Sequence, residues 1–208
     1  MNRTQIIDFY SKYSTQYNSK IGSLNLYDEL YKSFVDNAPR KSTLLDLACG
    51  PGNVSAFLLK LIPDVKITCV DLSDEMLRIA KSRLPNAEFY QSDIVNLTIP
   101  PKAYDLVVCA FGFPFITKGD IEICAQQLNN FTHQESRIYI STMKGHTSQL
   151  ENVSFGGDEK LLIHYHQRDY IEQTFIDNSF QLISYFEQNY PEEDGSQTTD
   201  MIFVFEKF

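Results

Sequence analysis

The sequence has little positive charge. Lysine and arginine number 18 against 27 aspartate and glutamate residues, which gives a formal net charge of −9. A surface this acidic repels phosphate backbones and anionic membranes unless it carries a local basic patch, and the one short basic cluster is Arg40 and Lys41. We therefore expect neither a nucleic acid nor a membrane as partner.

Long apolar segments and paired cysteines are also missing. No segment reaches the length of a membrane span, and the first residues lack the apolar core of a signal peptide, so we expect a cytoplasmic protein. The cysteines form no CxxC pair or Cys/His cluster, which argues against a zinc site and a disulfide framework. We expect no metal, and reduced, mostly buried thiols at Cys49, Cys69, Cys109 and Cys124.

What the sequence does contain is enough apolar material for one large core. Hydrophobic residues make up 43% of the 208 positions and aromatic residues 13%, which argues against a disordered chain. The sequence shows no internal repeat or low-complexity tract, and the polar interval 146–160 is the one candidate break. We interpret this interval as an insertion and expect a single domain over residues 1–208.

The stretch 44–53 combines an apolar run, an acid and a turn of small residues. Its first half is typical of a short buried strand of a parallel sheet, and residues 54–61 then predict a helix. Asp46 places a negative charge beside the start of that helix, where backbone amides can approach a ligand. Three small residues keep the turn free of side-chain bulk: Ala48, Gly50 and Gly52. A strand, a tight turn and a helix start together predict a ligand site.

A second acid follows the next predicted strand, residues 66–70. Asp71 lies 21 residues after Gly50, which is the spacing expected for one helical crossover. An acid at the carboxyl end of the second strand of a doubly wound sheet can accept hydrogen bonds from both hydroxyls of a ribose. The pair of motifs therefore predicts a nucleoside-containing cofactor.

Both motifs resemble those of class I S-adenosylmethionine-dependent methyltransferases, small-molecule type. Asp46-x-Ala48-x-Gly50-x-Gly52 is similar to the family's acid-x-Gly-x-Gly-x-Gly loop, with alanine at the first glycine. The run Asp-x-Ser-x-x-Met-Leu-x-x-Ala at residues 71–80 resembles the family's corresponding segment. The resemblance covers about residues 10–142 and implies S-adenosylmethionine as the cofactor.

The resemblance also implies which residues contact that cofactor. Asp46 and the loop amides would face its amino-acid tail, Asp71 its ribose, and Tyr17 and Cys109 its methionine end. Met76, Asp93 and Ile94 would contact the adenine. The full set of expected cofactor-binding residues is Tyr17, Asp46, Ala48, Gly50, Gly52, Asp71, Leu72, Met76, Asp93, Ile94 and Cys109. Core packing for Met76, helix packing for Tyr17 and a simple turn role for Asp93 stay open as structural alternatives.

The alternation of predicted elements favours an α/β fold. We expect a doubly wound, Rossmann-like sheet of seven strands, mostly parallel with an antiparallel edge hairpin, and helices on both faces. Beyond the two strands above, strands are predicted at residues 87–91, 104–110, 137–142, 182–186 and 201–205, with a short extra strand at 161–166. Other helices are predicted at residues 4–18, 24–37, 73–84, 119–131 and 168–180.

Within this fold we expect four functional segments. Residues 1–40 would form covering helices, 41–142 the cofactor-binding core, 143–166 a substrate-side insertion and 167–208 the C-terminal helix and hairpin. Aromatic residues after the strand 104–110 should face the reactive end of the cofactor. The candidate substrate-side residues are Phe113, Phe115, His146, His164 and His166, and none of them is assigned as a general base.

The leading hypothesis is a methyltransferase acting on an oxygen, nitrogen or carbon nucleophile of a small molecule. An NAD-dependent oxidoreductase is less favoured, because Ser55 stands where a dinucleotide fingerprint needs its third glycine. A non-catalytic module that binds the cofactor or acts as a scaffold is the remaining alternative, supported slightly by Ala48. The methyl acceptor and the oligomeric state are left open by the sequence.

Overall fold

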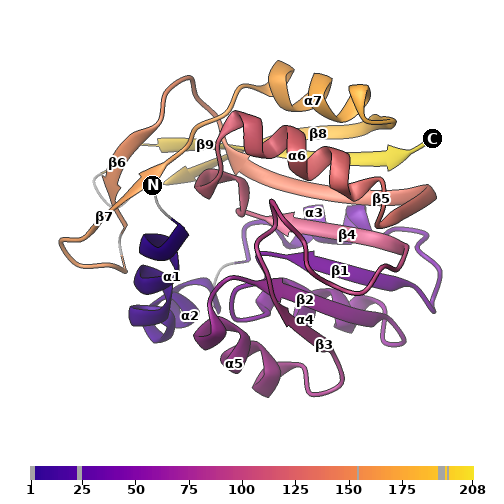
Figure 1. The fold of residues 1–208 in the computed structure, drawn as a ribbon, viewed down its shortest axis with the longest axis horizontal. Coiled ribbons are helices and arrows are strands. Elements are labelled where there is room, and N and C mark those ends of the chain that lie inside the picture. The colour runs from indigo at the N-terminus through magenta and orange to yellow at the C-terminus, as the bar shows by residue number, and fades with distance from the viewer. Residues whose placement is uncertain (1–2, 23–24, 154, 192–194, 196) are drawn as a thin grey trace.

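A seven-stranded sheet forms the centre of the molecule (Figure 1). The computed structural model describes residues 3–22, 25–153, 155–191, 195 and 197–208. The strands of the sheet lie in the order β3-β2-β1-β4-β5-β9-β8, and β9 runs antiparallel to both of its neighbours. Their bounds, in that order, are Glu88–Gln91, Lys66–Asp71, Thr43–Leu47, Tyr104–Ala110, Thr132–Met143, Gln197–Lys207 and Phe180–Pro191. The expected Rossmann-like α/β architecture with an antiparallel edge is confirmed.

Helices cover both faces of the sheet. One hydrophobic cluster packs α6 and α7 against the sheet, and a second packs α3, α4 and α5 on the other face. The helices are α1 (Arg3–Lys12), α2 (Ser14–Gly22), α3 (Asp28–Phe34), α4 (Asn53–Leu61), α5 (Asp74–Arg83), α6 (Lys118–Leu128) and α7 (Arg168–Asp177). Because both faces are covered, the central strands are nearly continuous apolar runs: Leu44, Leu45, Val107 and Val108 have no exposed surface.

The covering part of the molecule differs in detail from the sequence prediction. The first predicted helix is two helices, α1 and α2, and the second is shorter than expected, with residues 23–24 outside the described part. The insertion contains a hairpin of β6 (Gln149–Asn152) and β7 (Lys160–Ile163), which lies beside α1 (Figure 1). This hairpin is stabilised by a third apolar cluster that joins Phe9 of α1 to Leu161 and Ile163.

The strand β5 begins earlier than the predicted strand 137–142, because residues 132–136 also belong to it. The backbone stays in the sheet because Ser136, which is fully buried, accepts the His133 N–H at 2.9 Å and donates to the Tyr104 carbonyl at 2.8 Å. The strand is irregular there, with a left-handed Glu135 (φ 72°) and a shift of register against β4. A side chain that replaces ladder hydrogen bonds in this way is difficult to recognise in sequence.

A pair of glycine substitutions tests how the loop after β1 is built. Gly52 has φ +76°, and a Cβ there would lie 3.1 Å from both Ala80 and Leu84, so Gly52→Ala should lower the free energy of unfolding by about 1–3 kcal/mol. Gly119 of α6 is exposed with open space around it, so Gly119→Ala should be neutral or stabilising by up to about 1 kcal/mol. Urea denaturation of both variants and of the unaltered protein measures their free energies of unfolding. If Gly52→Ala were as stable as Gly119→Ala, the predicted strain at position 52 would be contradicted.

Candidate functional site

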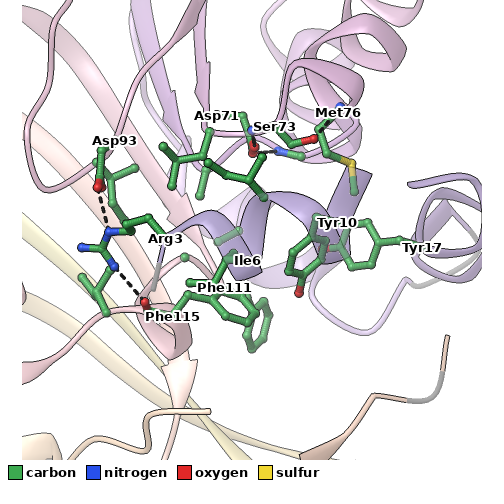
Figure 2. A pocket seen from close by; sticks show the side chains of 18 residues that line it. Arg3, Ile6, Tyr10, Tyr17, Asp71, Ser73, Met76, Asp93, Phe111 and Phe115 are labelled. Carbon is green, nitrogen blue, oxygen red and sulfur yellow. Dashed lines mark hydrogen bonds and ion pairs between the residues drawn. The ribbon is translucent and has the colours of Figure 1, made fainter. Parts of the chain in front are cut away.

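A cavity opens at the carboxyl ends of the central strands. Its walls come from the loop after β1, the end of β2, the start of α5, the turn after β3 and the segment after β4. Side chains of α1 and α2 complete it from the outside, so the cavity lies between the sheet and these two helices (Figure 2). In doubly wound sheets this is the place where ligands bind.

Asp71 organises one wall of the cavity. Its carboxylate oxygens accept the Gly50 N–H at 2.8 Å and the Ser73 N–H at 2.9 Å, so a single side chain connects the glycine loop to the start of α5. Burial raises the pKa of this carboxyl, while the backbone donors oppose that rise. Because each carboxylate oxygen accepts more than one hydrogen bond, these backbone contacts do not exclude a ligand donor at Asp71.

The loop after β1 adopts left-handed backbone conformations at its small residues. Ala48 and Gly50 both have φ +53°, and a Cβ on Gly50 would lie 3.5 Å from the ring of Tyr17. The left-handed region is easily reached by glycine and rarely by alanine. Ala48 therefore adopts the left-handed conformation that glycine, the residue at this position of the family's loop, reaches without strain. The loop keeps the same backbone shape with alanine in place of that glycine.

Asp46 lies beneath this loop and is not part of the cavity wall. It is 1% exposed, and its carboxylate accepts a hydrogen bond from the Ser55 hydroxyl at 2.6 Å. Burial raises the pKa of Asp46 to about 7, and the Asp71 carboxylate acts in the same direction. A direct contact between this side chain and a ligand in the cavity would require the loop to move.

The start of α5 forms the next part of the wall. Ser73 caps the helix by accepting the Met76 N–H at 3.3 Å, and its hydroxyl also lies 3.0 Å from the hydroxyl of Ser11 on α1. Leu72 and Met76 line the cavity. Met76 is 1% exposed, so its side chain is both a core residue and a wall of the site.

The turn after β3 brings an acid to the opposite end of the cavity. Asp93 accepts the Val95 N–H at 2.9 Å through one oxygen and the Arg3 guanidinium at 2.7 Å through the other. Ile94 follows it and also lines the cavity. Sequence reasoning missed Arg3, because an ion pair between residues 90 positions apart leaves no signal in a single sequence.

Aromatic side chains surround the rest of the cavity. Tyr10 and Tyr17 pack edge to face with ring centroids 5.3 Å apart, and Tyr10 contacts Phe115 at the same distance (Figure 2). Phe155 of the insertion lies 5.0 Å from Tyr17. Burial raises the pKa of both tyrosines, so their hydroxyls stay neutral. Phe111 is one of the aromatic residues after the strand 104–110 that were expected to face the cofactor, and it lines the cavity. Tyr10 and Phe155 were not predicted, although the repeating aromatics of the first helix were a usable signal for Tyr10.

Several predicted residues lie away from the cavity wall. Cys109 is buried below Gly112, where an added Cβ would meet its sulfur at 2.7 Å, and burial raises the pKa of its thiol. Gly52 faces α5, and Phe113 is 2% exposed and packs in the core with Phe175. Of the predicted substrate-side residues, the structure brings Phe115 to the cavity.

The three histidines predicted on the substrate side do not line the cavity in the part of the chain that the structure describes. His146 is exposed, and His164 pairs with the Ser148 hydroxyl at 2.7 Å. His166 is 1% exposed and donates from Nε2 to the Phe113 carbonyl at 3.0 Å, and burial lowers its pKa. Its observed contact is structural, because it connects the segment after β7 to the short helix η1 (Phe113–Phe115).

Comparison with known proteins agrees with this geometry. Residues 44–135 match a family described as a methyltransferase domain. A demethylmenaquinone methyltransferase of Thermotoga maritima is 41% identical over 70 residues (34% of this chain, 31% of that protein), and a trans-aconitate 2-methyltransferase of an Azoarcus species is 36% identical over 93 residues (38% and 36%). The aligned segment thus spans about a third of these relatives.

Among solved structures, the fold is similar to that of magnesium protoporphyrin IX methyltransferase from Synechocystis, determined with bound S-adenosylmethionine. The TM-score is 0.75 at 14% identity, and the alignment covers 100% of this chain and 98% of the other. At this identity the likeness concerns the fold alone. Within the described residues, no helix has the length and apolarity needed to cross a membrane.

Proposed function

We propose that the chain is a class I S-adenosylmethionine-dependent methyltransferase and that it methylates an apolar, ring-bearing small molecule; its match to a methyltransferase-domain family and to methyltransferase relatives supports this. S-adenosylmethionine is the cofactor of this family and supplies an electrophilic methyl group when bound. The protein's own contribution is then to hold the nucleoside, to exclude water and to place an acceptor in line. Positioning of this kind can contribute effective molarities of roughly 10⁵–10⁸ M.

The cavity fits the nucleoside half of such a cofactor. Asp71 can accept hydrogen bonds from ribose hydroxyls, and Met76 and Ile94 provide apolar surfaces for a flat base. Asp93 lies at the same end and can accept a hydrogen bond from an exocyclic amine. At the opposite end, a Cβ on Gly50 would already touch the ring of Tyr17 at 3.5 Å, so the cofactor's amino-acid portion would lie beside this pair. Asp46, Gly52 and Cys109 would support this wall from behind.

The acceptor side favours an apolar molecule over a polyanion. Ile6, Tyr10, Phe111 and Phe115 contribute apolar surface to the cavity. Among the described lining residues, Arg3 is the one with a basic side chain, and it already pairs with Asp93. A tricarboxylate such as trans-aconitate would need more cationic partners than this, whereas a quinone-like ring matches aromatic walls. We assign the insertion 143–166 to this side because Phe155 packs on Tyr10 and Tyr17.

No described residue of the cavity offers a neutral imidazole as a proton acceptor. The tyrosine hydroxyls of Tyr10 and Tyr17 have raised pKa values and stay protonated, so they can donate a hydrogen bond to an acceptor oxygen but do not act as bases at neutral pH. Acceptors that are already anionic, such as enolates, acidic phenols or carboxylates attached to a ring, are therefore preferred. This preference narrows the search for the substrate.

One observation carries the proposal: Asp71 lines a cavity with aromatic walls and hydrogen-bonds both the glycine loop and the start of α5. Calorimetric titration with S-adenosylmethionine, S-adenosylhomocysteine and NAD should give micromolar binding of the first two and none of the third. Acidic phenols, hydroquinones and aliphatic tricarboxylates are then compared as acceptors by methyl transfer from labelled cofactor. Turnover of tricarboxylates alone would contradict the apolar acceptor, and binding of neither sulfur ligand would contradict the cofactor site.

A further inference from the structure

Arg3 joins four separate parts of the structure through one guanidinium group. It belongs to the first turn of α1, and its Nε donates to Asp93 at 2.7 Å. One terminal nitrogen donates to the Phe115 carbonyl at 3.1 Å, and the other lies 3.5 Å from the Asp120 carboxylate of α6. Figure 2 shows the first two contacts at one end of the cavity. We propose that Arg3 is a positioning and specificity-determining residue: it orients the Asp93 carboxylate to read an amine on the bound base and fixes α1 over that base.

The first part of this proposal follows from the hydrogen bonds of Asp93. Its two oxygens are fixed by different donors, the Val95 N–H and the Arg3 guanidinium, so the plane of the carboxylate is set. A carboxylate oxygen accepts more than one hydrogen bond, so an amine of a ligand can bind while Arg3 stays in place. An ionised carboxylate has no proton to give, and it therefore disfavours a base that presents a carbonyl at the same position. Without Arg3 the carboxylate can turn, and this discrimination should weaken.

The second part follows from the construction of α1. A helix of ten residues is marginal by itself, so its position depends on tertiary contacts. Ile6 and Tyr10 lie on the same helix as Arg3 and also line the cavity. Arg3 and its two acidic partners are 24–29% exposed, so these contacts are less screened than those of a fully exposed ion pair. The same guanidinium that orients Asp93 therefore also holds Ile6 and Tyr10 of α1 against the cavity.

The geometry requires arginine and not simply a positive charge. Three nitrogens of one planar group face three different partners, whereas a lysine ammonium at the end of a flexible chain cannot reproduce this fork. Arg3→Lys therefore keeps the charge and loses the orientation, and Arg3→Gln loses both. A matched control is Arg78→Gln, because Arg78 is an exposed arginine of α5 that pairs with Glu75 and does not line the cavity.

The inference rests on the proposed cofactor site, so binding of S-adenosylhomocysteine to the unaltered full chain is measured first. Absence of that binding would refute the function itself. If binding is present, the probes are S-adenosylhomocysteine and S-inosylhomocysteine, in which a carbonyl replaces the amine of the base. For Arg3→Gln we expect about tenfold weaker binding of the adenine probe, a smaller preference for adenine over inosine, and faster dissociation by stopped flow.

We expect Arg3→Lys to lose most of the base preference despite its charge, and Arg78→Gln to resemble the unaltered protein. Thermal denaturation without ligand identifies any general loss of folding. An unchanged adenine-to-inosine ratio in Arg3→Gln would overturn the specificity role, even if both probes bound more weakly. Unchanged dissociation rates would overturn the role of Arg3 in fixing α1.

Discussion

Asp71→Ala should lower the affinity for S-adenosylhomocysteine by about 100-fold, equivalent to about 3 kcal/mol. The side chain accepts the N–H groups of Gly50 and Ser73, so its removal leaves two amide donors without a protein acceptor and frees the loop from α5. The ligand would also lose the carboxylate proposed to hold its ribose. Two independent losses at one residue make this the substitution with the largest expected effect on binding.

Asp71→Asn is expected to be almost as damaging. An amide presents one NH₂ group where Asp71 has an oxygen, and this group would face a backbone N–H donor. The matched control is Asp74→Asn, an exposed acid in the first turn of the same helix. Isothermal titration of the three variants, with circular dichroism to verify folding, is the measurement. A folded Asp71→Ala variant that binds within threefold of the unaltered protein would show that the ribose is held elsewhere.

Asp46 should make the free energy of unfolding fall as pH rises from about 5 to 7, and the buried His166, whose pKa is lowered by burial, should oppose part of this fall. Burial raises the pKa of Asp46 to about 7 from a model-peptide value of 3.8. Between these two values the folded state binds a proton that the unfolded state has released, so stability is present at low pH and is lost as pH rises toward 7. This difference between the folded and unfolded pKa values of Asp46 lowers the free energy of unfolding by about 2–3 kcal/mol between pH 5 and 7.

Asp46→Asn removes the titrating group and keeps an oxygen for the Ser55 hydroxyl. We therefore expect the variant to gain stability relative to the unaltered protein as pH rises, whereas Asp74→Asn should follow the unaltered curve. The pKa of Asp71 is raised in the same direction, so some pH dependence should remain in the Asp46 variant. Urea denaturation at pH 5, 6, 7 and 8 measures these slopes. Parallel curves for the Asp46 variant and the unaltered protein would show that Asp46 does not titrate in this range.

The central sheet could be predicted from sequence because its signals are local. The strands β1, β2 and β4 are short apolar runs ended by acids or small residues, and their order along the chain fixes the parallel crossovers. The start of α5 was equally readable, because Ser73 caps the helix by a contact with Met76, three residues away. Such sequence patterns involve residues close together in the chain, so they can be recognised without knowledge of the distant contacts.

The covering elements were predicted less well because their structure depends on distant contacts. The hairpin of β6 and β7 carries polar residues and is held by Phe9 and neighbouring side chains from α1. Likewise, the continuation of β5 through residues 133–136 relies on Ser136 bonding to Tyr104, 32 positions away. Neither contact has a periodic pattern that a single sequence displays.

The sequence by itself determined the sheet, the glycine loop and the acids at its strand ends, because each follows from residue spacing within a single strand-turn-helix unit. Tertiary structure decided which of these acids faces the cavity: Asp71 and Asp93 line it, while Asp46 lies below the loop. It also decided that α1 brings Arg3 to Asp93 and that Phe155 of the insertion meets Tyr17. These pairs lie 90 and 138 residues apart, and such contacts form only when the chain packs, because no local propensity encodes them.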